Sequence, residues 1–219
     1  MKIFRGELNR IRLLSRPFQI RQYLRNHDLR LLNVGSGPHK EKGWLTADKF
    51  SPDADIYLNV YAKLPFQDDT FDIIHSSHLI EHIKIDKIPY FLQEIYRVLK
   101  TNGLLRISTP DLELFAKNYI EKNNDFFLPA IEKYKSRVSM QKNKYWLVRS
   151  NGSIFMMRAV NRFYHHRWMY DYETLSLCLG EIGFKECIKQ SFRKSIIDIA
   201  GKLDKDTRAW ESLYIDAIK

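Results

Sequence analysis

Short apolar runs alternate with segments of helical periodicity between residues 31 and 110. The runs at 31–34, 44–47, 55–60, 71–76 and 104–108 predict strands, and a helix is expected over 87–99. Strands that alternate with helices are typical of a mostly parallel, doubly wound sheet, so an α/β fold is predicted.

The remainder of the chain adds a different pattern. A helix is predicted over 111–123 and another over 172–182, where Gly183 ends it. Residues 184–192 and 212–218 predict two final strands. Residues 125–170 are basic, aromatic and poor in strand signal, and we interpret them as a helical lid inserted over the sheet.

The N-terminal segment, residues 3–26, carries apolar residues at roughly helical spacing with arginines between them. Pro17 is expected to divide it into two helices. This basic arm, assigned to residues 1–29, could pack on the main domain of residues 30–219 or lie on an anionic membrane.

The net charge of +10 is unevenly distributed. Residues 1–30 hold eight Lys and Arg against two acids, and residues 132–167 hold nine against one. Such a surplus favours an anionic small molecule or glycan, or an acidic membrane surface, although it also fits a solvated surface. No nucleic-acid recognition motif accompanies it, and the oligomeric state stays open.

Several classes of protein are disfavoured by the sequence. No apolar run approaches the ~18 residues that span a bilayer, so a cytoplasmic protein is predicted, with peripheral contact at the inner membrane face left open. Cys178 and Cys187 are expected to be reduced thiols. No Cys/His spacing resembles a zinc site, so no metal is predicted.

A glycine turn follows the first predicted strand in the stretch LLNVGSGPHKEKGWLTADKF. Gly35 and Gly37 let the backbone approach a ligand closely. Asp48 ends the second predicted strand, where a carboxylate can accept hydrogen bonds from ribose hydroxyls. This order of features predicts a nucleotide site.

Beyond the turn, LPFQDDTFDIIHSSHLIEHI leads into EIYRVLKTNGLLRISTPD. The ordered set of motifs over residues 30–110 resembles the class I S-adenosylmethionine-dependent methyltransferases. That resemblance implies a Rossmann-like seven-stranded sheet with an antiparallel last strand, and S-adenosyl-L-methionine as cofactor. The cofactor-binding residues that it implies are Asn33, Gly35, Ser36, Gly37, Asp48, Asn59, Val60 and Ser76.

Two departures from the family pattern concern the cofactor site. Only six residues separate Gly37 from Trp44, so the usual helix after the glycine turn must be short or missing. Asn59 stands where many members have Asp. A dinucleotide-dependent oxidoreductase is the rival class, but His39 and Lys40 occupy the region where GxGxxG needs its third glycine.

Candidate catalytic residues follow the fourth and fifth strands. His78 and His82 are four residues apart, and either could act as a general base, while Glu81 could orient a histidine. His82 with Glu81 could equally serve packing and capping. Asp111 is a candidate base or substrate ligand, or else the N-cap of the next helix.

Candidate substrate-binding residues end the predicted lid. His165, His166 and Arg167 could hold a phosphate or a carboxylate. The short crossover and the HHRWMYDYETL segment resemble a branch associated with bacterial surface-polysaccharide and lipopolysaccharide biosynthesis. O-methylation of a sugar hydroxyl on a nucleotide- or lipid-linked glycan is therefore expected. A small-metabolite or RNA methyltransferase, or a non-catalytic cofactor-binding partner, are the alternatives.

Overall fold

The computed structural model describes residues 2–129 and 166–219. Its seven-stranded sheet has the order β3-β2-β1-β4-β5-β7-β6. The strands are β1 (Leu31–Val34), β2 (Trp44–Asp48), β3 (Ile56–Tyr57), β4 (Phe71–Ser77), β5 (Leu99–Pro110), β6 (Glu186–Gln190) and β7 (Ser212–Ile218). Strand β7 is antiparallel to β5 and β6, and the other neighbouring pairs are parallel. The predicted sheet is confirmed.

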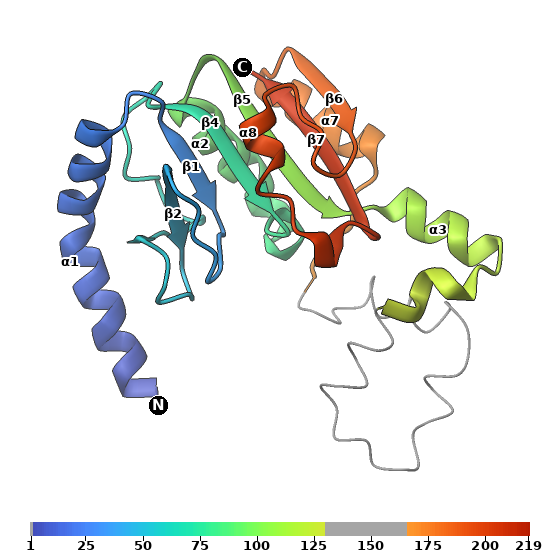
Figure 1. Ribbon diagram of the computed structural model, residues 1–219, viewed down its shortest axis with the longest axis horizontal. Coiled ribbons are helices and arrows are strands. Elements are labelled where there is room, and N and C mark those ends of the chain that lie inside the picture. Colours follow the sequence, from blue (N-terminus) through green and yellow to red (C-terminus); the bar gives the residue numbers. More distant parts are fainter. Residues whose placement is uncertain (1, 130–165) are drawn as a thin grey trace.

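Helices cover the sheet unequally on its two faces (Figure 1). Helices α2 (Ile88–Val98) and α7 (Tyr172–Ile182) contribute to the main core on one face. The short helix α8 (Asp198–Gly201) packs on the other face, where Ala200 contacts a smaller cluster that includes Leu31 and Ile73. Helix α3 (Leu112–Ile120) carries a third cluster beyond the end of β5.

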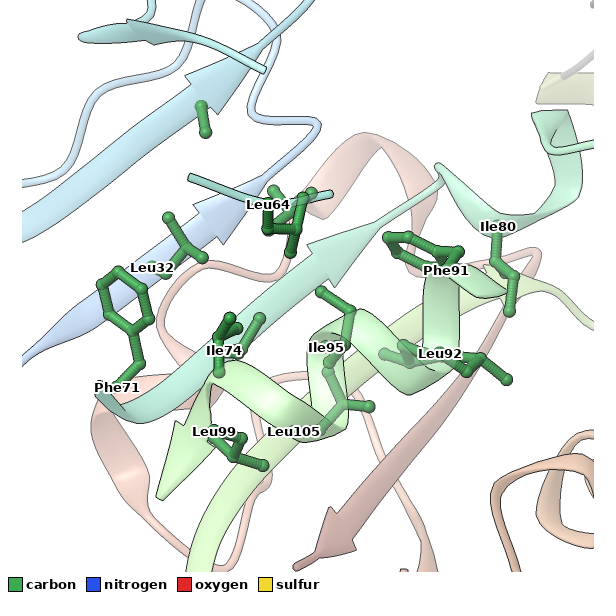
Figure 2. Packing of buried hydrophobic residues seen from close by; sticks show 14 of the residues in the cluster. Leu32, Leu64, Phe71, Ile74, Ile80, Phe91, Leu92, Ile95, Leu99 and Leu105 are labelled. Carbon is green, nitrogen blue, oxygen red and sulfur yellow. The ribbon is translucent and has the colours of Figure 1, made fainter. Parts of the chain in front are cut away.

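The main core forms where α2 lies across the central strands (Figure 2). Phe91, Leu92 and Ile95 are spaced by one to four positions, so they share the helix face that packs on Ile74 and Leu105. All five side chains are at most 1% exposed. This buried face explains the helix, because tertiary packing rather than intrinsic propensity stabilises most helices of this length.

Local signals set the bounds of α7. The Asp171 carboxylate caps its N-terminus by accepting a hydrogen bond of 2.8 Å from the Thr174 amide. Gly183 ends it in the left-handed region, at φ +119°, and its amide donates to the carbonyl oxygens of Leu179 and Gly180. The predicted range 172–182 is therefore confirmed to the residue.

The prediction that Pro17 divides the N-terminal segment is wrong. Helix α1 (Lys2–Asn26) continues through the proline. On one side of Pro17, the Arg12 guanidinium donates to the carbonyl oxygens of Ala54 and Ile56. On the other side, the Tyr23 hydroxyl accepts from the Leu31 amide at 2.8 Å. These contacts hold both halves of the helix on the domain. Their stabilisation outweighs the loss of the backbone hydrogen bond that the proline removes.

Other predicted bounds shift because sheet neighbours decide them. Strand β3 is only two residues long, whereas β5 extends over twelve residues between β4 and β7. The crossover at 35–43 contains turns and no helix, as the short spacing predicted. Most of the predicted lid at 125–170 lies outside the described residues. In the described part of the chain, no helix is both long and apolar enough to cross a membrane.

A buried ionic network attaches α8 to the sheet. The Arg106 side chain on β5 pairs with Asp216 on β7 at 2.9 Å and with Asp204 after α8. All three side chains are 0% exposed. Ser195 and the Ile196 amide also donate to Asp216, at 2.8 and 2.7 Å. The segment from Ser191 to Asp204 is thus fastened to the sheet by a satisfied polar cluster.

Candidate active site

A cavity of about 560 Å³ opens at the carboxyl ends of β1, β2 and β4. Ligands of doubly wound sheets bind at this edge. The cavity is lined by Val34, Gly35, Ala47, Asp48, Lys49, Phe50, Leu58, Val60, Tyr61, His78, Leu79, His82, Ile83 and Arg167. Its apolar walls and few polar groups are typical of a small-molecule site.

The glycine turn forms one wall of this cavity. Gly35 has φ +74°, and a Cβ placed on it would lie 3.0 Å from the Leu79 side chain. Its amide donates to the Ala47 carbonyl oxygen at 2.8 Å, which ties the turn to β2. Glycine is therefore required here by both the backbone conformation and the close approach of Leu79.

Asp48 organises the loops around the cavity. One carboxylate oxygen accepts from the Gly37 amide at 3.0 Å. The other accepts from the amides of Phe50 and Ser51, at 2.6 and 2.7 Å. Because a carboxylate has about four acceptor positions, Asp48 can hold these loops and still accept a hydrogen bond from a ligand.

Of the other predicted cofactor-binding residues, two line a cavity and four do not. Val60 lines the main cavity, whereas Asn33 lines a smaller cavity of about 130 Å³ that also contacts Gly35. Ser36 is buried and donates to the Gly37 carbonyl oxygen at 3.2 Å. Ser36 and Gly37 thus shape the turn and line neither cavity.

Asn59 and Ser76 also lie outside the lining of both cavities. The Asn59 side-chain oxygen accepts from the Tyr61 amide at 3.4 Å, so it shapes the loop that presents Val60 and Tyr61. Ser76 is 1% exposed within β4. Direct ligand contact by these two residues stays a prediction.

Several residues that line the cavity belong to no motif that was predicted from the sequence. Lys49 and Phe50 directly follow Asp48, and Tyr61 directly follows Val60. The Lys49 Nζ atom lies 5.6 Å from the centre of the Phe50 ring and 5.9 Å from that of Tyr61. The sequence could have indicated these residues by their position directly after the motif residues, because loops beyond strand ends form such sites.

His78 occupies a tight turn after β4 and has φ +50°. Its Nε2 lies 2.8 Å from the Ser212 hydroxyl, which donates its own proton to the Arg208 carbonyl oxygen. The ring must therefore donate at Nε2. Its Nδ1 lies 3.1 Å from Glu81, so an ionised Glu81 requires a proton there too. This arrangement favours a positioning role for His78, and its predicted catalytic role stays a prediction.

Glu81 lies at the centre of the cluster and is 0% exposed. Burial opposes its charge, but the hydrogen bond from His78 and the nearby histidines outweigh burial and hold the pKa of Glu81 below its usual value. The Glu81 backbone carbonyl oxygen also accepts from the Arg167 amide at 2.6 Å. Glu81 thus joins the turn after β4 to the segment that begins at His166.

His82 and Arg167 face the cavity from these two segments. The His82 side chain is 36% exposed, and its Nε2 lies 3.9 Å from Glu81 Oε1. The buried His166 ring meets His82 edge to face, with centroids 4.9 Å apart. Burial lowers the pKa of His166 to about 4, so this ring is neutral near pH 7. The predicted residue His165 lies outside the described residues.

The same cluster contains a group that could hold a metal ion. Ligand atoms of Glu81, His82 and His166 all lie within 4.8 Å of one another. However, one Glu81 oxygen already faces His78, and the cation Arg167 borders the same cavity. A further divalent cation would meet like charge there. The cluster therefore fits a buried carboxylate that His78 holds through a hydrogen bond.

Asp111 lies away from both cavities. Its carboxylate accepts from the Leu114 amide at 3.2 Å and caps helix α3. Burial raises the pKa of Asp111. The N-cap alternative is confirmed, and a catalytic role for this residue stays a prediction.

The two glycines of the turn allow a matched test of its geometry. Gly37→Ala is expected to lower the free energy of unfolding by about 1 kcal/mol, because only its left-handed backbone, at φ +59°, opposes a side chain. Gly35→Ala should cost roughly 1 kcal/mol more, because its Cβ would also press on Leu79. Urea denaturation measures both values. Equal losses would contradict the close approach of Leu79.

Known proteins are similar to this chain in sequence and in fold. A family model described as a methyltransferase domain matches residues 9–189. The search among curated proteins found no match. The crystal structure of an S-adenosylmethionine-dependent methyltransferase from Archaeoglobus fulgidus has a TM-score of 0.51 and 14% identity, and the alignment covers 97% of this chain and 94% of that one.

A second similar structure is an S-adenosylmethionine-dependent methyltransferase from Thermotoga maritima. It has a TM-score of 0.48 and 18% identity, and the alignment covers 87% of this chain and 82% of that one. At 14% identity the likeness to the Archaeoglobus fulgidus structure concerns the fold alone, whereas the family model covers most of the sequence. The chain belongs to the methyltransferase domain family.

Proposed function

We propose that the protein is an S-adenosylmethionine-dependent methyltransferase that binds its cofactor in the 560 Å³ cavity. The observation that carries this proposal is the meeting of the Gly35 turn and the Asp48 carboxylate at the mouth of one cavity, at the carboxyl edge of a parallel sheet. The cavity lies within the size range of ordinary small-molecule sites.

The residues present fit the cofactor. Asp48 can accept a hydrogen bond from a ribose hydroxyl. Leu58, Val60 and Ile83 form apolar walls that suit the adenine ring. Gly35 has no Cβ, and a Cβ there would press on Leu79. Its bare backbone therefore suits close approach of the methionine part.

When bound, S-adenosylmethionine supplies an electrophilic methyl group and a sulfur leaving group. The chain must then align the acceptor and, for a hydroxyl acceptor, remove a proton. His82 is the best-placed base, since it lines the cavity and its side chain is partly exposed. When the His82 ring takes the proton, the Glu81 carboxylate, whose Oε1 lies 3.9 Å from Nε2, stabilises the imidazolium.

We propose a sugar hydroxyl on a nucleotide- or lipid-linked glycan as the acceptor. Arg167 at the cavity provides a cation for a phosphate or carboxylate of such a substrate. The two basic segments of the chain support an anionic acceptor. The resemblance to the polysaccharide branch supports the sugar.

The test combines a titration with an assay of methyl transfer. The wild-type protein should bind S-adenosylhomocysteine and transfer labelled methyl groups to diphosphate-linked sugars. His82→Asn should retain this binding but lower kcat by about 100-fold, because general-base catalysis typically contributes that much. His27→Asn is the matched control, because His27 stacks on Tyr23 at the end of α1 and lines neither cavity.

Each outcome bears on a separate part of the proposal. No binding of S-adenosylhomocysteine by folded wild type would remove the cofactor assignment. Methylation of RNA or of a small metabolite instead of glycans would replace the acceptor. Unchanged kcat in His82→Asn, with glycan methylation intact, would remove His82 as the base.

A further inference from the structure

Helix α1 presents apolar side chains to solvent along one line. Ile11, Leu14 and Phe18 are 61%, 75% and 70% exposed, respectively. Their spacing of three and four residues places them on one face of the helix. Single exposed apolar residues are ordinary, but three large ones on successive turns form a patch that needs an explanation.

The opposite face of α1 is committed to the domain. Arg12, Ile20 and Tyr23 are at most 9% exposed. Arg12 donates to the carbonyl oxygens of Ala54 and Ile56, at 3.3 and 3.1 Å. The Tyr23 hydroxyl donates to the carbonyl oxygen of Gly43 at 2.9 Å. These contacts prevent the helix from rotating, so the Ile11–Leu14–Phe18 face is held outward. Figure 1 shows α1 at the outer edge of the molecule.

Cations accompany the apolar face. Arg10, Arg21 and Arg25 are exposed. Because successive residues of a helix are rotated by about 100°, Arg21 and Arg25 lie on the same side of α1 as Leu14 and Phe18. Within Lys2–Asn26, Glu7 is the single acid. Apolar side chains flanked by arginines are typical of helices that lie in the interface of an anionic bilayer.

We propose that the outward face of α1 docks on an anionic lipid surface. Ile11, Leu14 and Phe18 enter the boundary between headgroups and acyl chains, and the arginines contact lipid phosphates. The proposal deepens the proposed function, and rests on it only for the acceptor, because membrane docking brings the enzyme to lipid-linked substrates.

The rim of the cavity continues this surface chemistry. Arg12 also donates to the carbonyl oxygen of Asp48, at 3.4 Å, so the helix is attached where β2 ends. The two residues that follow are Lys49 and Phe50, and Phe50 is 78% exposed. An exposed ring and a cation thus lie at the cavity mouth, next to the attachment point of the docking helix.

A second copy of this chain fits the face less well. Pairing two α1 helices would bring arginines of one copy against arginines of the other, and like charges oppose association. An anionic membrane has the complementary charge along the whole face. We therefore assign the face to lipid, and self-association is an outcome that the experiment can reveal.

The test is sedimentation of the full-length protein with phosphatidylcholine vesicles, alone or containing phosphatidylglycerol. We expect binding to the anionic vesicles that weakens with added salt. The triple variant Ile11→Ser, Leu14→Ser, Phe18→Ser should bind about tenfold or more weakly. The triple variant Arg10→Gln, Arg21→Gln, Arg25→Gln should bind roughly 100-fold more weakly.

Matched controls are Ile120→Ser on α3 and Leu177→Ser on α7, which remove apolar side chains that are 76% and 64% exposed elsewhere. Both should bind vesicles as the wild type does. The proposal is overturned if wild type ignores anionic vesicles or if the apolar triple variant binds them unchanged. It is also overturned if ultracentrifugation shows a dimer that this variant disrupts.

Binding of S-adenosylhomocysteine, measured on the same samples, separates the two proposals. A wild type that binds S-adenosylhomocysteine but ignores anionic vesicles would overturn membrane docking alone. Vesicle binding without cofactor binding would overturn the proposed function and leave the docking surface in place.

Discussion

The Asp48→Ala variant is expected to bind S-adenosylhomocysteine at least about 100-fold more weakly than wild type. A hydrogen bond to a charged acceptor contributes about 1.5–3 kcal/mol, and the ribose would lose the one that Asp48 can still accept. The variant also releases the amides of Gly37, Phe50 and Ser51, which Asp48 now holds. Calorimetric titration measures the affinity, and urea denaturation on the same sample reports the folded fraction.

Two further variants separate ligand contact from loop shape. Asp48→Asn keeps one acceptor oxygen and the shape of the side chain, so its affinity should fall only about tenfold. Asp53→Ala removes an exposed carboxylate from the same loop and should bind as wild type does. Wild-type affinity in a folded Asp48→Ala variant would show that the cofactor lies elsewhere.

The Arg106→Met variant should show the largest loss of stability. It leaves the 0%-exposed carboxylates of Asp204 and Asp216 without their cation. Removing one partner of a buried ion pair typically costs about 3–5 kcal/mol. Chemical denaturation at neutral pH measures the change. Arg106→Lys keeps the charge but loses the branched contacts, so its loss should be smaller and measurable even if Arg106→Met does not fold.

The pH dependence of the same variant has a defined sign. In wild type, burial opposes the charge of Asp204, but the His75 ring 3.6 Å away and hydrogen bonds from Arg106 and the Arg193 amide outweigh burial and lower its pKa. That stabilisation is present above the ordinary Asp value near 4 and is lost as the pH falls through the lowered pKa. Without Arg106, burial dominates, so protonation favours the folded state. The deficit against wild type should therefore shrink as the pH falls from 7 towards about 4.

A surface ion pair provides the control for Arg106. Lys87 lies 3.5 Å from Asp86, and both side chains are more than half exposed. Lys87→Met should change the free energy of unfolding by less than about 1 kcal/mol. Similar losses for Lys87→Met and Arg106→Met would contradict the role assigned to burial in the Arg106 network.

Elements with strong local signals were predicted closely. The apolar run of β1, the capped helix α7 and the strand β7 have the bounds that the sequence predicted. In each case the signal lies within or next to the element, as with Asp171 and Gly183 at the ends of α7. Strand β5 was longer than predicted because its extra residues follow from pairing with β4 and β7.

The predicted cofactor motifs could also be found in the sequence, but the sequence did not show which of their residues line the cavity and which shape the turn. Gly35, Asp48 and Val60 line the cavity, whereas Ser36 and Gly37 shape the turn beside it. Sequence order places all five near one sheet edge, because motifs at strand ends converge there. Which side chains face the cavity depends on turn geometry, and adjacent residues in a turn can face opposite ways.

The α/β fold and the family follow from the sequence, because they depend on periodicity and on motifs at strand ends, and the same motifs predicted that Gly35 and Asp48 meet at one sheet edge. Tertiary structure alone decided that α1 continues through Pro17, that Ser212 holds His78 and that Arg106 joins Asp204 to Asp216. The contacts of Arg12 with Ala54, of Arg106 with its two carboxylates and of His78 with Ser212 join residues from 42 to 134 positions apart. Local sequence carries no record of such pairs, since folding brings them together only when the whole core is packed.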